Sequence, residues 1–85
     1  MGRQRSLEVI AKEEYVTIGE LVRLTNVRYS TLKYYTEEGL IPFEQAEENL
    51  TRRYNRELAI KRIEELIDLR KKGMTIPEVK VKLLS

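Results

Sequence analysis

The 85-residue chain contains no cysteine, no histidine and no tryptophan. Without cysteine and histidine it cannot form a disulfide framework, a zinc finger or a histidine-based catalytic site. Its apolar runs are only a few residues long, which is too short for a membrane-spanning helix. The first 14 residues carry charges at both ends and have too short an apolar segment for a signal peptide. We therefore expect one soluble, cytoplasmic domain.

The residue patterns of an enzyme are missing as well. There is no nucleophile paired with a base and no glycine-rich phosphate loop, and the acids lack the paired placement that hydrolytic chemistry requires. The acidic stretch from Glu44 to Glu48 has no caging pattern for a cation, so we expect a solvated turn there. The sequence thus predicts a protein that is not an enzyme and binds no cofactor and no metal.

The formal net charge of +2 is small, but the charges are unevenly distributed. Residues 23–34 carry three bases and no acid, whereas residues 36–48 carry five acids and no base. Residues 49–85 carry ten bases against five acids. This alternation indicates a basic surface assembled from separate segments, with the acidic stretch facing elsewhere. Solvated helix faces of mixed sign would give a similar pattern, so charge alone does not identify a partner.

Two short helices with a turn between them are predicted in the first half of the chain. Thr17 and Glu20 have the spacing of a capping box, which begins a first helix. Asn26 tolerates the left-handed conformation and can end that helix. The second helix is predicted over residues 29–38, where Gly39 ends it. This arrangement is a helix-turn-helix.

Further helices are predicted on both sides of this motif. Ser6 can cap a short helix over residues 6–14. Asn55 caps a long helix that runs to about residue 72, and Thr75 begins a last helix with a second capping box. The inward-facing apolar residues are expected to be Leu7 and Ile10 in the short helix, Leu58, Ile60, Ile63, Leu66, Ile67 and Leu69 in the long helix, and Val79, Leu83 and Leu84 in the last.

The second helix of the motif is basic and rich in tyrosine. In a helix-turn-helix this helix enters the major groove of DNA with its N-terminal end first. Arginine reads guanine edges or holds phosphate, serine and threonine do either more weakly, and lysine and tyrosine farther along suit phosphates. Core packing is the alternative role for the tyrosines, and we expect it for Tyr35, which shares a face with Leu32. The contacts expected with double-stranded DNA are Arg28, Tyr29, Ser30, Thr31, Lys33 and Tyr34.

The residue order from Tyr15 to Leu84 resembles the DNA-binding domain of the MerR family of bacterial transcription regulators. The family pattern runs roughly T-I-G-E-L, a G-V turn, S-x-x-T-L-R-Y-Y-E-x-x-G-L and a nearby proline. This chain has TIGEL at 17–21, NV at 26–27, TLKYYT at 31–36, GL at 39–40 and proline at 42. The resemblance implies a mainly α, winged helix-turn-helix domain over residues 15–85, with about four helices and a short two-stranded wing. Residues 1–14 would be an N-terminal extension.

The same resemblance assigns roles to the segment before the long helix. Two short strands within residues 43–54, joined by a turn near residues 47–49, would form the wing. Arg52 would hold a phosphate, Tyr54 would fasten the wing to the helices, and Arg53 would reach the DNA backbone or the minor groove. A solvated basic cluster is the alternative, although positive charge at a helix start is disfavoured by the helix dipole. The expected DNA contacts are completed by Thr17, Arg52 and Arg53.

Four positions depart from the family pattern. Asn26 replaces glycine, Arg28 replaces a capping serine or threonine, Lys33 replaces arginine and Thr36 replaces glutamate. The missing cap at Arg28 is expected to weaken the helix start by about 1 kcal/mol. A lysine makes a point-charge contact where arginine would make a bidentate one. The first three changes leave the preferred DNA sequence unpredictable.

Three functions fit the sequence. The first is sequence-specific binding of double-stranded DNA for transcription regulation, in the cytoplasm at the nucleoid. The second is a stand-alone winged-helix protein in DNA recombination, partition or architecture, similar to small excisionases. The third is a protein-interaction module that docks through its last helix or its N-terminal extension. Family regulators normally continue into a dimerisation helix and a sensor, so a second copy or a partner protein on DNA stays open, as do the operator and any effector.

Overall fold

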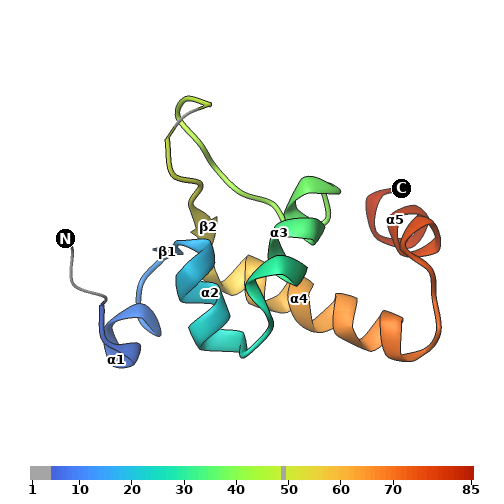
Figure 1. Cartoon of the computed structure of the whole chain (residues 1–85), viewed down its shortest axis with the longest axis horizontal. Coiled ribbons are helices and arrows are strands. Elements are labelled where there is room, and N and C mark those ends of the chain that lie inside the picture. The colour runs from blue at the N-terminus through green and yellow to red at the C-terminus, as the bar shows by residue number, and fades with distance from the viewer. Residues whose placement is uncertain (1–4, 49) are drawn as a thin grey trace.

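A computed structural model of the chain describes residues 5–48 and 50–85. This part is mainly helical and contains one small antiparallel sheet, which confirms the predicted winged helix-turn-helix class (Figure 1). Residues 43–48 and 50–53, here called the wing, extend away from the helices between α3 and β2. The elements are α1 (Leu7–Ile10), β1 (Tyr15–Val16), α2 (Ile18–Thr25), α3 (Tyr29–Glu37), β2 (Tyr54–Asn55), α4 (Arg56–Lys71) and α5 (Ile76–Leu84).

The core lies where α2, α3 and α4 pack against one another. Leu21 of α2, Leu32 of α3 and Leu66 of α4 are all fully buried. Burying a leucine side chain contributes about 1.5–3 kcal/mol relative to leaving it exposed, so these three contacts stabilise the domain substantially. Ile10 of α1 and Val79 of α5 are buried in the same cluster. The N-terminal segment and the last helix therefore belong to the same folding unit.

The helix ends follow the capping signals in the sequence. The Thr17 hydroxyl accepts a hydrogen bond from the Glu20 amide at 3.2 Å, and the Glu20 carboxylate accepts one from the Thr17 amide at 2.9 Å. Thr75 begins α5 in the same way. Asn26 adopts the left-handed conformation with φ 60°, which ends α2 and turns the chain into α3. The helices predicted from the Thr17 cap to Asn26, over residues 29–38, from the Asn55 cap to about residue 72 and from the Thr75 cap onward are confirmed, with ends that agree to within a residue where an end was predicted.

The strand pairing differs from the predicted wing. The two-stranded sheet joins β1 to β2, with Tyr15 opposite Asn55 and Val16 opposite Tyr54, whereas in the described residues of the wing the predicted antiparallel pairing is one bridge, Glu44 with Arg53. The β1–β2 pairing places two apolar side chains in the core, because Val16 and Tyr54 are both shielded from solvent. The predicted turn near residues 47–49 includes Asn49, which lies outside the described residues.

Three apolar residues that were expected to face the core lie at the surface instead. Leu7 is exposed because α1 is a single turn, shorter than the predicted helix over residues 6–14, and only Ile10 reaches the core. Leu58 is also exposed, since the buried stripe of α4 runs through Ala59. Leu84, near the end of α5, is exposed as well.

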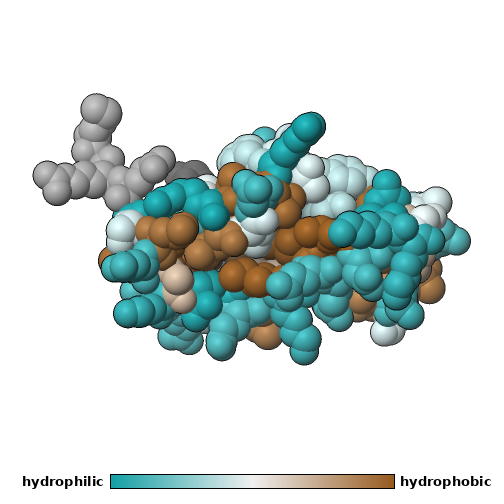
Figure 2. All heavy atoms as spheres, turned by 90° about the horizontal axis from the view of Figure 1, so that it is seen from below, coloured by the Kyte–Doolittle hydropathy of each residue, from teal (hydrophilic) through white to brown (hydrophobic). Residues whose placement is uncertain are grey.

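The surface is mostly hydrophilic, but some apolar side chains gather on the side away from the wing (Figure 2). Exposed apolar residues occur on α1, α4 and α5, and a folded monomer normally exposes some of its apolar side chains. Among the helices in residues 5–48 and 50–85, none combines the length and the apolar character needed to cross a membrane.

Candidate nucleic-acid interface

The solvent-facing side of α3 is the best candidate for a nucleic-acid contact. Leu32, Tyr35 and Thr36 form the buried side of this helix, which confirms the predicted core role of Tyr35. Side chains one turn apart share a face, so the opposite side projects to solvent. We call this side the outer face, and it consists of Ser30, Lys33, Tyr34 and Glu37, all of which are exposed.

The N-terminal end of α3 carries the next two predicted contacts. Arg28 is the N-cap residue, and its side chain makes no capping hydrogen bond. Tyr29, the first residue of the helix, is about half exposed. Amides in the first turn of a helix have no partner within the helix and favour an anion nearby. The arginine and the amides of the first turn therefore present positive charge at the same end of α3.

Thr31, expected on the exposed side, is half-buried instead. It lines a hollow of about 360 Å³, which Ser30, Tyr34 and Arg70 also line. Sequence reasoning did not single out Arg70, although the basic run at residues 70–72 was a signal for it. The structure thus adds a cation from the end of α4 to the surroundings of α3.

Thr17 is the N-cap residue of α2, and its hydroxyl caps the helix. A larger hollow of about 670 Å³ is lined by both Thr17 and Tyr29, together with Arg5, Glu20 and Arg23. Thr17 and the N-terminal end of α3 are therefore brought to one surface, as the predicted set requires.

The two wing arginines point to different partners. Arg52 donates a hydrogen bond from Nη2 to Oε2 of Glu37 at 3.2 Å, and its guanidinium lies 4.8 Å from the centre of the Phe43 ring. Arg52 therefore lies beside the C-terminal end of the outer face. Arg53 instead stacks over the ring of Tyr15 on β1, 5.2 Å from its centre.

Tyr15 holds the base of the wing from both sides. Its hydroxyl donates to Oε2 of Glu44 at 2.9 Å, while its ring carries Arg53. The hydrogen bond to the Glu44 carboxylate raises the pKa of Tyr15 above its ordinary value. Nothing in the sequence indicated a function for Tyr15, because its partners Glu44 and Arg53 are far away along the chain.

Tyr54 fastens the wing to the helices, as the resemblance implied. Its side chain is fully buried, and its hydroxyl lies 3.0 Å from Oγ1 of Thr36 on α3. The Thr36 hydroxyl donates its one hydrogen to the carbonyl oxygen of Leu32 at 2.8 Å. Tyr54 is therefore the donor in the hydrogen bond between the two hydroxyls. The threonine that replaces the glutamate of the family pattern thus accepts the hydrogen bond that joins β2 to α3.

The described part of the chain holds no cluster of three or more acidic, histidine or cysteine side chains that could bind a metal ion. Apart from the carboxylates of Glu20 and Glu37, which are paired with arginines, this surface carries arginine, lysine and hydroxyl groups. These groups donate hydrogen bonds and positive charge, which suits phosphate oxygens and base edges.

Comparison with known proteins agrees with this architecture. The model of a protein family described as MerR HTH family regulatory protein matches residues 16–85. This match covers all elements from α2 to α5 and supports a DNA-binding regulatory role. Neither a curated protein nor a solved structure matches the chain.

Proposed function

Because the chain belongs to the MerR HTH family of regulatory proteins, we propose that it binds specific sequences of double-stranded DNA and regulates transcription. In this proposal α3 lies in the major groove and the wing lies on the DNA backbone. The protein would act in the cytoplasm, at the nucleoid. The observation that carries the proposal is the outer face of α3, which is polar, exposed and flanked by cations at both ends.

Individual roles follow from position along α3. Arg28, Tyr29 and Ser30 lie at the end that enters the groove, so we assign them to base edges or to the phosphates beside them. Lys33 and Tyr34, one turn farther along, contact phosphates in this proposal, and Thr31 supports them from the flank. Thr17 contacts the backbone from the start of α2.

The wing supplies the second part of the interface. Arg52 and Arg53 contact the DNA backbone in this proposal, Arg52 from beside the end of α3 and Arg53 from above Tyr15. Surface ion pairs of the Arg52–Glu37 kind contribute only about 0–1 kcal/mol, so a phosphate can replace the carboxylate at small cost.

Selection from a pool of random DNA duplexes tests this function. We expect one sequence to be enriched, and we expect Arg28→Ala to lose about 1–3 kcal/mol of discrimination at a single base position. Uniform weakening on all sequences would show that Arg28 contacts only phosphate. Binding without enrichment of any sequence would contradict sequence-specific regulation and favour the architectural function instead.

A further inference from the structure

The segment before the family match is built into the domain. Residues 5–14 precede the matched range of 16–85, yet Ile10 is fully buried in the common core. Arg56 at the start of α4 holds the segment in two places, because its Nε donates to the carbonyl of Glu13 at 2.7 Å and its amide donates to the carbonyl of Glu14 at 2.9 Å. The segment therefore has a fixed position relative to α2 and α3.

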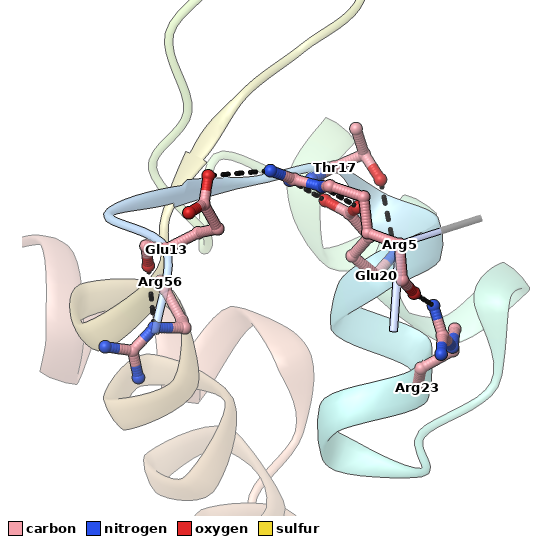
Figure 3. A network of polar contacts seen from close by, with 6 residues as sticks. All are labelled: Arg5, Glu13, Thr17, Glu20, Arg23 and Arg56. Carbon is pink, nitrogen blue, oxygen red and sulfur yellow. Dashed lines mark hydrogen bonds and ion pairs between the residues drawn. The ribbon is translucent and has the colours of Figure 1, made fainter. Parts of the chain in front are cut away.

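Arg5 is the centre of a polar network on this segment (Figure 3). Its guanidinium donates to both carboxylate oxygens of Glu20, each at 2.7 Å, and to Oε1 of Glu13 at 2.7 Å. These hydrogen bonds raise the pKa of Arg5 and lower the pKa of Glu20, so both groups stay charged and paired. The positive charge of Arg5 is thus neutralised by the carboxylates of Glu13 and Glu20.

Glu20 lies at a sensitive position for DNA binding. It is in the first turn of α2, and the first helix of a helix-turn-helix crosses the DNA backbone. An unpaired carboxylate there would repel phosphates, although the capping box needs the side chain. Pairing with Arg5 removes this repulsion and keeps the cap.

Arg23 is a cation of this network whose charge no carboxylate in the described part of the chain cancels. Its Nη1 donates to the backbone carbonyl of Arg5, a neutral acceptor that does not cancel its charge. Among the described residues no carboxylate forms an ion pair with it. Arg23 lines the hollow of about 670 Å³ that also holds Thr17 and Tyr29, so it lies next to the N-terminal end of α3.

On the premise of the proposed function, we infer that Arg23 is a further contact to the DNA phosphodiester backbone, and that Arg5 is its positioning residue. Arg5 acts in two ways: its carbonyl orients the guanidinium of Arg23, and its own guanidinium neutralises Glu20 beside the same strand of DNA. Residues 5–14 thereby extend the DNA-binding surface beyond the part that the family shares.

The first test is the salt dependence of affinity for a duplex, measured by fluorescence anisotropy. We expect Arg23→Gln to make the slope of log affinity against log salt concentration shallower by about 0.9, the value for one phosphate contact. Lys61→Gln on α4 is the matched control, since it removes the same charge from an exposed position outside the hollow, and its slope should equal that of the wild type.

The second test separates the two actions of Arg5. We expect Arg5→Gln to weaken binding, and we expect Glu20→Gln in the same chain to restore part of the lost affinity, because glutamine keeps the capping box without the negative charge. If the double variant binds no better than Arg5→Gln alone, Arg5 does not act by neutralising Glu20. Unfolding curves of each variant show whether the domain is intact.

The outcomes also separate this inference from the function on which it rests. A wild-type chain that binds no duplex overturns both. A wild type that binds with a steep slope, together with an Arg23→Gln variant of unchanged slope, overturns only the role of Arg23.

Discussion

At the scale of single residues, two buried hydroxyl groups link the wing to the helix that we place in the DNA groove. Tyr54 donates to Thr36, and Thr36 in turn donates to the carbonyl of Leu32 within α3. Buried polar groups are costly unless they are paired, and here both hydroxyls are satisfied. The pair fixes the wing base against α3, and with it the position of Arg52 relative to the outer face.

Tyr54→Phe tests this link. The substitution removes the donor and leaves an acceptor site on Thr36 unfilled, so we expect a loss of about 0.5–1.5 kcal/mol in the free energy of unfolding, measured in urea. Tyr34→Phe is the control, because that hydroxyl is at the surface, and its effect should stay within about 0.5 kcal/mol. Equal stability of the two variants would contradict the assigned role of the Tyr54 hydroxyl.

Glu37 is the acid on the outer face, and it pairs with Arg52 in the protein alone. In the proposed complex its carboxylate competes with phosphate for that arginine. We expect Glu37→Gln to bind duplex DNA more tightly by up to about fivefold, the range that a surface ion pair allows. Glu64→Gln, which removes an acid from the middle of α4, is the comparison for the change in net charge. A Glu37→Gln variant that binds more weakly than the wild type would show that the carboxylate serves the complex instead.

Residue roles could be predicted from the sequence only where they depend on near neighbours. The core role of Tyr35 followed from helical spacing to Leu32, and the structure confirms it. The role of Thr36 could not be foreseen, because its partner Tyr54 is 18 positions away. The exposure of Leu58 was missed because the direction of α4 against its neighbours decides which side of its apolar stripe is covered.

At the scale of elements, the N-terminal end of α3 lacks a side-chain cap and carries an exposed cation. Its N-cap position is occupied by Arg28, which makes no capping hydrogen bond, whereas α2, α4 and α5 all begin with a side-chain cap. A protein optimised for stability alone would place serine, threonine or aspartate there. We attribute the arginine to the proposed contact with DNA.

Arg28→Ser tests this trade between stability and binding. We expect the serine cap to raise the free energy of unfolding by about 0.5–2 kcal/mol and the loss of the guanidinium to weaken DNA binding. Arg28→Ala is the matched control, which should weaken binding without the gain in stability. Binding by Arg28→Ser as tight as that of the wild type would remove Arg28 from the interface.

Element bounds were predictable to the extent that they depend on caps. Thr17, Asn55 and Thr75 each predict the start of a helix, because a capping residue bonds an amide three residues farther along. Asn26 predicts the turn between α2 and α3. The β1–β2 sheet was not predicted, because its pairing joins distant segments. Val16 pairs with Tyr54, which is far from it along the chain, and no local pattern in either segment identifies the other as its partner.

At the scale of the whole molecule, the net charge of +2 is small, but the bases among the described residues fall into two groups: those paired with acids of the protein and those that are not. Several acids are paired with bases inside the protein: Glu20 and Glu13 with Arg5, Glu37 with Arg52, and Glu38 with Lys80. Cations at and around α3 stay available for an external anion in the proposed complex. The charge alternation along the chain predicted such a surface. Only the folded arrangement shows which bases form ion pairs with acids of the same chain.

The affinity of the wild-type chain for a DNA duplex, measured as the salt concentration rises, tests the central claim most directly. The proposed backbone and groove cations are Arg28, Lys33, Arg52, Arg53 and Arg23. If four or five of them neutralise phosphates, log affinity should fall against log salt concentration with a slope between about −3.5 and −4.5. A flat response, or no binding at low salt, would contradict the account of this domain as a reader of DNA.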